Sequence, residues 1–457
     1  MVIVIPFVWG AVLAVFGALH WYTWRRLVRD TSRPGSLLRR AGSFVFIAGP
    51  LLTVAALAAE TRAPFLLQQI LAWPGYLWMA LFLYLVLALL ASEAVRPALR
   101  RLPRRRRNVD THEQAHPAVD AVAASPGKSG ADRNEELTAG GPRPVPAAHG
   151  VSGTTPQITA AATVAEHPRT PEPGSSPRPG VTDPSRRLFV SRVVGGSAAA
   201  LAVGTVGHGT YDVLRGPKVK RITVALAKLP RSAHGFRIAV VSDIHLGPVL
   251  GRGFAQKVVD TINATQPDLI AVVGDLVDGS VKDLSPAAEP LAGLRARHGT
   301  FFVTGNHEYY SGAEQWVEKV RDLGLRPLEN ARTELPAFDL AGVNDLAGTD
   351  EGQGPDFTRA LGDRDRSRPA VLLAHQPILI HDAVRHGVDL QLSGHTHGGQ
   401  LWPGNLIADL TNPTLAGVER YGDTQLYVSR GAGAWGPPVR VGAPSDITVV
   451  DLASKQA

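Results

Sequence analysis

The sequence predicts an α/β fold for the C-terminal part of the chain, preceded by an all-α transmembrane region and a disordered linker. From about residue 215 onward, short runs rich in β-branched residues alternate with segments of helical spacing, a pattern typical of a layered α/β domain. Before residue 108, long apolar stretches are flanked by arginines, as in membrane-spanning helices. The chain between these regions is rich in Ala, Pro, Gly, Ser and Thr.

These composition changes divide the chain into four segments. We predict a transmembrane region with three helices at 1–107, a Pro/Ala/Gly-rich linker at 108–184, a signal or membrane anchor at 185–214 and the α/β domain at 215–457. The linker shows no apolar periodicity, so it cannot bury enough apolar surface to offset the entropy cost of ordering. The α/β domain, at about 240 residues, is long enough for a substantial core.

Three apolar stretches in the first segment predict membrane-spanning helices, at 2–24, at about 41–59 and at about 65–95. A helix needs roughly 20 apolar residues to cross the hydrocarbon core. Trp73-Pro74-Gly75 interrupts the third stretch, so we expect its helix to start near Tyr76. A buried core helix is the alternative for any one stretch, but three together with arginine-rich flanks favour a membrane region.

The positive charge of the chain lies beside these stretches. The net charge is +7, yet residues 1–107 alone carry 14 basic and 3 acidic side chains. Arginines in loop 25–40 and in run 96–107 predict that both are cytoplasmic, which leaves the N-terminus and the link 60–64 outside. The α/β domain has no excess of positive charge, so we expect no nucleic-acid partner. The chain has no cysteine, which excludes disulfides, thiolate metal sites and cysteine nucleophiles.

The segment 185–214 begins with Ser-Arg-Arg-Leu-Phe-Val and continues with an apolar stretch at 193–206. It resembles a twin-arginine export signal, for which Ala200-Leu201-Ala202 is a candidate cleavage site. A basic membrane anchor is the alternative. Either one carries the chain from inside to outside, so we predict a multi-pass protein of the cell membrane with an extracytoplasmic α/β domain.

Nine strands and two helices are predicted in the α/β domain. The helices are 254–264 and 313–323. The strands are 221–226, 237–241, 269–273, 300–303, 337–341, 370–373, 390–392, 425–428 and 447–450.

Carboxylate, amide and imidazole side chains recur where these strands end. They form five groups: Asp243-x-His245, Gly274-Asp275-x-x-Asp278, Gly305-Asn306-His307-Glu308, His375 and Gly394-His395-x-His397. Open α/β sheets build their sites at the carboxyl ends of strands. One such motif means little by itself, but the ordered set suits two divalent metal ions that share one carboxylate, and Asp275 is our choice for the shared ligand.

This ordered set resembles the full signature of calcineurin-like metallophosphoesterases, over roughly residues 235–450. The resemblance implies a four-layer αββα sandwich, in which two mixed sheets are flanked by helices and the motif loops gather at one edge. It also implies one ion held by Asp243, His245, Asp275 and His397 and a second held by Asp275, Asn306, His375 and His395. Nitrogen and oxygen ligands are compatible with Mn, Fe, Zn or Mg and do not choose among them.

The chemistry expected of such a site is hydrolysis of a phosphodiester or phosphomonoester. Two divalent ions about 3.5–4 Å apart can clamp the attacking and leaving oxygens and supply a bridging hydroxide as nucleophile. We predict His307 as the general acid that protonates the leaving alkoxide, and Asp278 as the partner that fixes its tautomer. A turn cap is the alternative for Asp278. Arg430 is a candidate phosphate contact, and a solvent-facing arginine is an equal alternative.

The identity of the substrate is less constrained. Gly279 stands where family members that act on phosphoproteins place an arginine, which argues against protein phosphatase activity. The residues around Asp243 and His397 resemble the bacterial membrane-associated, twin-arginine-exported branch, and this location points to phosphodiesters or phospholipid head groups. The alternative function is a non-catalytic metal- and phosphate-binding sensory module, but such a module needs no proton donor like His307. No feature of the sequence indicates the oligomeric state of the protein.

Overall fold

The computed structural model of the chain describes residues 4–60, 62–101 and 186–456. The predicted linker 108–184 lies outside the described residues. The described parts of 1–102 and 184–457 belong to one compact unit, which contains both the apolar helices and the α/β domain. Contacts between these two parts are therefore contacts within a single unit.

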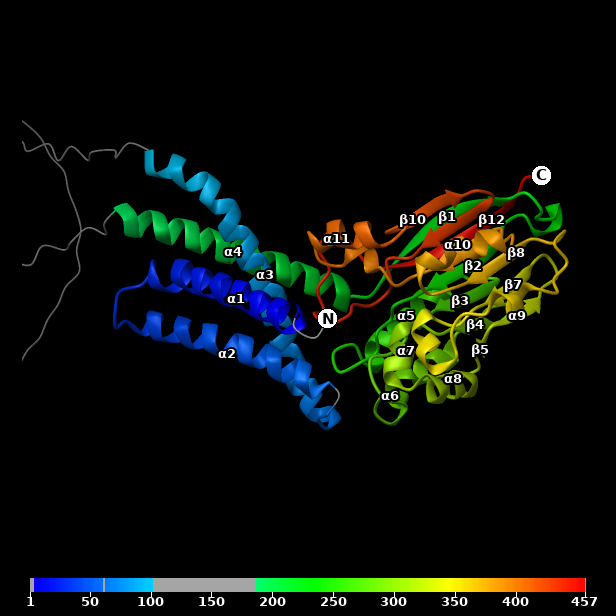
Figure 1. The fold of residues 1–457 in the computed structure, drawn as a ribbon, viewed down its shortest axis with the longest axis horizontal. Coiled ribbons are helices and arrows are strands. Elements are labelled where there is room, and N and C mark those ends of the chain that lie inside the picture. The colour runs from blue at the N-terminus through cyan, green and yellow to red at the C-terminus, as the bar shows by residue number, and fades with distance from the viewer. Residues whose placement is uncertain (1–3, 61, 102–185, 457) are drawn as a thin grey trace, which may run out of the picture. The chain divides into compact units, whose positions relative to one another are not determined.

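Four long helices, α1 (Val4–Trp24), α2 (Leu37–Ala59), α3 (Phe65–Arg101) and α4 (Arg186–Leu214), form the apolar part (Figure 1). Among the residues searched, three stretches are long and apolar enough to cross a membrane: Leu37–Ala59, Phe65–Ala94 and Leu188–Leu214. The predicted stretches at 41–59 and 65–95 are thus confirmed as helices that could cross a membrane. The stretch predicted at 2–24 is helical from Val4 but is not among these three, and 193–206 is the middle of a longer helix that is.

The predicted start of the third helix near Tyr76 is wrong, because α3 continues through Pro74 from Phe65. The reason lies in packing against α2. A Cβ atom on Gly75 would lie 2.7 Å from Ala56 Cβ, so the glycine lets the two helices approach closely. Thr53 Oγ1 also donates a hydrogen bond to the carbonyl oxygen of Gly75 (2.9 Å). The Trp-Pro-Gly sequence marks a helix contact here and not a helix start.

The α/β part contains two six-stranded mixed sheets, and all nine predicted strands are confirmed with small shifts of their ends. The first sheet has the order β1 (Lys218–Leu226), β12 (Asp446–Ser454), β2 (Phe236–Val241), β3 (Leu269–Val273), β4 (Thr300–Val303) and β5 (Arg326–Pro327). The second has the order β10 (Gly417–Tyr421), β11 (Thr424–Val428), β9 (Leu390–Ser393), β8 (Ala370–Leu373), β7 (Asp339–Gly342) and β6 (Ala331–Glu334).

Seven shorter helices connect the strands. They are α5 (Arg252–Ala264), α6 (Val281–Ala288), α7 (Asn306–Ser311), α8 (Ala313–Asp322), α9 (Phe357–Leu361), α10 (Ile380–Arg385) and α11 (Gly404–Thr411). Both helices predicted in this region are confirmed, as α5 and α8.

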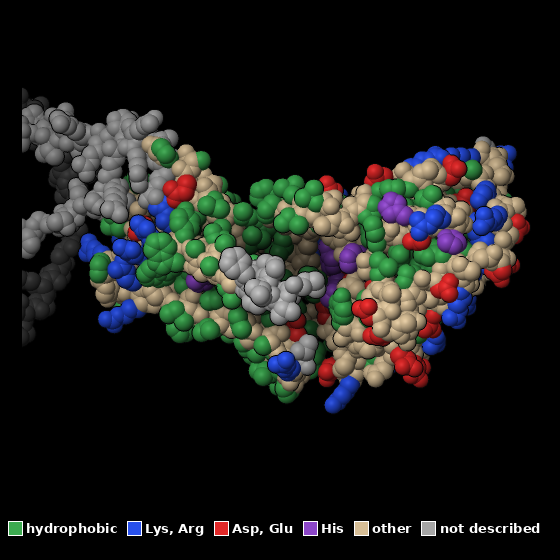
Figure 2. Space-filling view, in the orientation of Figure 1, with side chains coloured by type: hydrophobic (Ala, Val, Ile, Leu, Met, Phe, Trp, Pro, Cys, Tyr) green, Lys and Arg blue, Asp and Glu red, His purple; other side chains and the backbone are tan. Residues whose placement is uncertain are grey.

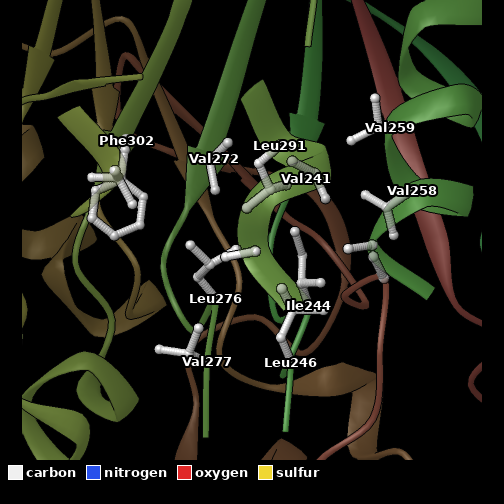
Figure 3. Packing of buried hydrophobic residues seen from close by; sticks show 14 of the residues in the cluster. Val241, Ile244, Leu246, Val258, Val259, Val272, Leu276, Val277, Leu291 and Phe302 are labelled. Carbon is white, nitrogen blue, oxygen red and sulfur yellow. The ribbon is translucent and has the colours of Figure 1, made fainter. Parts of the chain in front are cut away.

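Alternation along the strands distributes their side chains between separate cores. In β2, Ile238 and Val240 belong to a core shared by the two sheets, whereas Ala239 and Val241 belong to a core shared with α5, α6 and α8. Figure 3 shows part of this second core, where Phe302, Val272 and Val241 from neighbouring strands lie in a row and Val258 of α5 lies beside Val241. A third core joins the second sheet to α9 and α10.

Strands β2, β3 and β4 are adjacent and parallel in the first sheet, and β8 and β9 are adjacent and parallel in the second. The carboxyl ends of each set therefore lie at one edge of their sheet. All five polar groups found in the sequence follow these five strands directly. The topology brings the groups of one sheet together, and packing of the two sheets brings the two sets together.

Candidate metal centre and active site

The loops that follow β2 and β3 continue to pair after the strands end. The backbone N–H of Asp243 donates to the carbonyl oxygen of Gly274 (3.1 Å), that of His245 to Asp275 (3.2 Å), and that of Leu246 to Leu276 (2.9 Å). The side chains of Ile244, Leu246, Leu276 and Val277 are buried in the core below (Figure 3). These apolar residues lie between the polar ones in the sequence and anchor both loops in the core.

The predicted ligands adopt an unusual backbone conformation. Eight described residues other than glycine have positive φ, and five of these are predicted metal ligands: Asp243, His245, Asp275, His395 and His397. This left-handed region is costly for non-glycine residues and is found where the surrounding structure enforces it, often at functional sites. The strain in this domain is thus concentrated on the residues that the motifs identified.

Two glycines of the motifs are required by close approach. A Cβ atom on Gly305 would lie 2.5 Å from the backbone nitrogen of Asp275, and one on Gly394 would lie 2.7 Å from Ser242 Cβ and overlap its hydroxyl oxygen. Any larger residue at either position would push a ligand loop away from the site.

The structure brings the seven predicted ligands together in two groups. Asp243, His245 and His397 form one group. His397 Nε2 lies 3.0 Å from His245 Nε2 and 3.4 Å from Asp243 Oδ1. Asp275, His375 and His395 form the other. Asn306 joins the second group because its Oδ1 lies 3.0 Å from His395 Nδ1.

Asp275 lies between the two groups. Its Oδ2 is 3.1 Å from His375 Nε2 and 3.8 Å from His245 Nε2. Its Oδ1 accepts a hydrogen bond from the backbone N–H of His307 (2.9 Å). A carboxylate in this position can reach ligands of both groups.

The donor set fits divalent metal ions. Asp243 and Asp275 are buried, and within the described ranges their ion-pair partners are all histidines. Buried carboxylates need compensating positive charge. His375 Nδ1 donates to the carbonyl oxygen of Val273 (2.9 Å), and its Nε2 lies 3.1 Å from Asp275 Oδ2. This buried contact must be balanced by a proton on Nε2 or by a cation between the two groups, and a divalent metal ion can supply the cation.

The electrostatics favour neutral imidazoles at two of the ligands. Burial, and next the neighbouring His375, lower the pKa of His395 to about 4. Burial, and next His245 and Arg440, hold the pKa of His397 well below its usual value. Burial by itself would raise the pKa of Asp275, but the facing His375 lowers it far below the ordinary range. Two neutral imidazoles and an ionised carboxylate are forms that metal binding requires. Burial would also lower the pKa values of His375 and His245, but Asp275 raises that of His375 well above its usual value and Asp278 raises that of His245 to about 9, so these two rings would have to lose a proton to bind metal.

Asp278 contacts two histidines at once. Its Oδ1 lies 2.7 Å from His307 Nδ1 and 2.8 Å from His245 Nδ1. The predicted pairing of Asp278 with His307 is therefore present, and the contact with His245 is an addition. Burial would lower the pKa of His307, but the hydrogen bond to Asp278 raises it. Asp278 can orient both rings and leave each Nε2 available on the other side.

Two buried residues near the site support its loops through contacts that the sequence does not specify; a supporting or structural role was expected for Glu308, and none for Arg440. Glu308 accepts hydrogen bonds from the backbone N–H groups of Asp275 (3.0 Å), Leu276 (2.7 Å) and Gly305 (2.6 Å). It thus ties the loop after β3 to the start of α7. Its place three residues after Gly305, the residue preceding the helix, is a capping signal that could have identified it.

Arg440 is the second such residue. It is buried, and its guanidinium lies 3.1 Å from His397 Nδ1 and donates to the carbonyl oxygen of His397 (3.1 Å). No local motif marks it, because its partners are mostly backbone carbonyl oxygens, and His397 lies 43 residues away in the sequence. The candidate Arg430 instead lies 3.9 Å from the carboxylate of Asp446.

A cavity of about 330 Å³ opens beside this centre. His245, Asp278, Gly279 and His307 line one side of it. Figure 2 shows histidine side chains in a hollow of the surface. A substrate in this cavity would meet His307 directly, and at Gly279 it would meet backbone and no arginine.

Comparison with known proteins identifies the family. The model of the calcineurin-like phosphoesterase family matches residues 236–399, a range that includes all seven predicted ligands. A "transmembrane protein with metallophosphoesterase domain" from Danio rerio is 39% identical over 273 residues, which cover 57% of this chain and 61% of that protein. The chain thus covers less than two thirds of the length of this relative.

Two bacterial relatives are covered more fully. An "uncharacterized metallophosphoesterase" of Helicobacter pylori strain J99 is 38% identical over 275 residues, 60% of this chain and 74% of that protein. One from Campylobacter jejuni is 36% identical over 282 residues, 61% of this chain and 74% of that protein. The chain belongs to the calcineurin-like metallophosphoesterase family, a family of metal-dependent hydrolases that act on phosphoric ester bonds.

Proposed function

We propose that the protein is a membrane-associated phosphoesterase with two divalent metal ions, which hydrolyses a phosphodiester or phosphomonoester. The observation that carries this proposal is the convergence of seven potential ligands into two groups that share Asp275. Asp243, His245, Asp275 and His397 would hold one ion, and Asp275, Asn306, His375 and His395 would hold the other. Bound there, the ions would supply Lewis acidity toward the phosphoryl oxygens and acidify a water molecule.

The chain's own residues supply the proton transfer. The contact with Asp278 occupies His307 Nδ1, so Nε2 is the atom that would carry the proton to the leaving oxygen. The same contact favours the protonated ring before the reaction. Asp278 also contacts His245, so one carboxylate would position both the proton donor and a metal ligand.

Hydrolysis of bis-p-nitrophenyl phosphate by the purified full-length chain tests this proposal. We expect release of p-nitrophenol that depends on added divalent metal and is lost in Asp275→Asn. For a phosphodiester with an alkoxide leaving group, His307→Ala should lower kcat by about 10²–10⁴-fold. The decrease should be much smaller for bis-p-nitrophenyl phosphate, whose p-nitrophenolate leaves without a proton, and bound metal, measured by elemental analysis, should stay at the wild-type level. Wild-type activity in both variants would refute the assignment. Binding of metal and phosphate without turnover by the wild type would favour the sensory module.

We further infer that the two sheets and their three hydrophobic cores form a four-layer αββα sandwich. We also infer that this domain lies outside the cytoplasmic membrane. Two contacts support this topology. Arg192 Nε at the start of α4 donates to the carbonyl oxygen of Thr31 in the arginine-rich loop 25–40 (3.0 Å). At the other end of the helices, Glu60 from the link 60–64 lines the same cavity as His307.

The structure of α4 favours the anchor alternative over a cleaved export signal. Ala198, Ala202 and Val206 are buried against other helices, so the candidate cleavage site lies in the middle of a packed helix. A reporter that works only outside the cytoplasm, fused after Ala457, should be active and remain in the membrane fraction. Activity of a reporter that works only in the cytoplasm would contradict this orientation.

A further inference from the structure

The cavity beside the candidate active site has a wall that the phosphoesterase domain does not supply. Glu60, Gln68 and Tyr76, from the link after α2 and from α3, line it together with His245, Asp278 and His307. Glu60, Gln68 and Tyr76 lie outside the region matched by the family model, residues 236–399. The apolar helices therefore contribute directly to the space in which a substrate would lie.

This wall is held in place by packing between the helices and the domain. Val249, in the loop after β2, packs against Ala56, Ala72 and Tyr76. Farther along α3, Tyr84 Oη donates to the carbonyl oxygen of Trp402 (2.9 Å). Val439 is fully buried in a cluster made mainly of α3 and α4 residues. Contacts at several points fix the position of Glu60 relative to His307.

The chemistry of the cavity is that of a site for an organic cation. Of the described residues that line it, none is lysine or arginine, and Glu60 is the one carboxylate outside the metal-centre residues. The Tyr76 hydroxyl donates a hydrogen bond to the Glu60 carboxylate and holds that side chain in position. Two aromatic rings flank the predicted proton donor: the ring centroids of Tyr310 and Trp435 lie 5.5 Å and 5.7 Å from that of His307. A cavity that is lined by both a carboxylate and aromatic rings can recognise an ammonium group.

Helix α11, which contacts the turn at His397–Gly399, indicates where such a substrate comes from. Helix α11 follows Trp402 and exposes apolar side chains, with Ile407 70% and Leu410 85% exposed. It has no buried residue, and its contact through Trp402 with Tyr84 joins it to the apolar helices. Figure 2 shows hydrophobic side chains gathered over the helical part. An exposed apolar helix that adjoins membrane spans fits the interfacial layer of a bilayer.

We propose that this cavity binds the head group of a membrane phospholipid that carries an ammonium group, such as an amino-alcohol phosphoester, and that Glu60 recognises the ammonium. The proposal rests on the phosphoesterase function proposed above. It assigns α2 and α3 a role in substrate selection in addition to anchoring the chain.

Two chromogenic substrates test the role of Glu60 in the full-length chain, kept in detergent or nanodiscs. p-Nitrophenyl phosphorylcholine carries an ammonium group, and bis-p-nitrophenyl phosphate does not. Glu60→Gln should raise KM for the first by about tenfold, the loss of one charge-assisted contact, with kcat unchanged. KM for the second should change by less than about twofold, and Glu318→Gln, at an exposed position of α8, should leave both unchanged.

The outcomes separate the two proposals. If neither substrate is hydrolysed by the wild type, the phosphoesterase function fails and this inference fails with it. If both are hydrolysed and Glu60→Gln affects them equally or not at all, only the role of Glu60 is refuted.

Vesicles test the source of the substrate. The wild type should release phosphoester products faster from phosphatidylethanolamine vesicles than from phosphatidylglycerol vesicles, and Glu60→Gln should remove the difference. Preference for phosphatidylglycerol would overturn the assignment of an ammonium group. Hydrolysis of the soluble ammonium substrate without any hydrolysis of vesicles would overturn the assignment of a membrane lipid.

Discussion

Replacing Glu308 by glutamine should destabilise the protein and loosen its metal centre. The Glu308 side chain is fully buried, and its two oxygens accept three backbone hydrogen bonds from the loops that carry Asp275 and Asn306. Glutamine has nearly the same shape, but one oxygen becomes an NH₂ donor. If the NH₂ group replaced Oε1, the buried N–H of Leu276 would face a donor instead of an acceptor. If it replaced Oε2, the N–H groups of Asp275 and Gly305 would both do so.

The size of the effect follows from this count. Leaving a buried donor unsatisfied costs about 1–3 kcal/mol, so we expect the free energy of unfolding to fall by about 2 kcal/mol for one lost bond. For a domain of this size, each kcal/mol shifts Tm by about 2–4 °C, which gives a decrease of about 4–8 °C. Because the same bonds hold the Asp275 loop, bound metal should decrease as well.

Thermal unfolding of the full-length protein in detergent, together with elemental analysis of bound metal, measures both effects. Glu318→Gln makes the same chemical change at an exposed position of α8 and should alter the unfolding free energy by less than about 0.5 kcal/mol. A Glu308→Gln variant with the Tm and metal content of the wild type would refute the view that Glu308 holds the ligand loops.

Two glycine substitutions test close packing in the two parts of the chain. Gly394→Ala would place a methyl group 2.7 Å from Ser242 Cβ, so elemental analysis should find much less bound metal. Gly253→Ala, where the added methyl group meets open space, should retain the metal. Gly75→Ala should lower Tm by several degrees, because overpacking against α2 costs about 1–3 kcal/mol. Gly17→Ala, where the added methyl group meets open space, should not lower Tm. Equal Tm values for these two variants would contradict the α2–α3 contact.

The strands were predictable because the buried ones are continuous apolar runs. Leu269–Val273 is buried on both faces between two cores, so each of its residues is apolar and its ends in the structure are those predicted. The motif residues that follow such strands could be placed at one edge by topology alone. Strands β5, β6 and β10 could not be found this way, because all three lie at sheet edges and include exposed polar residues.

What could not be predicted depends on contacts between distant parts of the chain. Pro74 and Gly75 are local helix-breaking signals, and only packing against α2 shows why the helix continues through them. Arg440 acts on backbone carbonyls and on a histidine ring, partners that no sequence spacing indicates. The contribution of Glu60 to the cavity depends on how the helices pack against the domain, and composition carries no information about it.

The most direct test of the account is the metal content of the purified full-length protein. The geometry around Asp275 predicts about two divalent ions per chain in the wild type and fewer in Asp275→Asn, with phosphodiester hydrolysis declining in parallel. A wild-type chain that holds no divalent metal after exposure to Mn, Fe, Zn and Mg, or an Asp275→Asn variant that holds as much metal as the wild type, would contradict it.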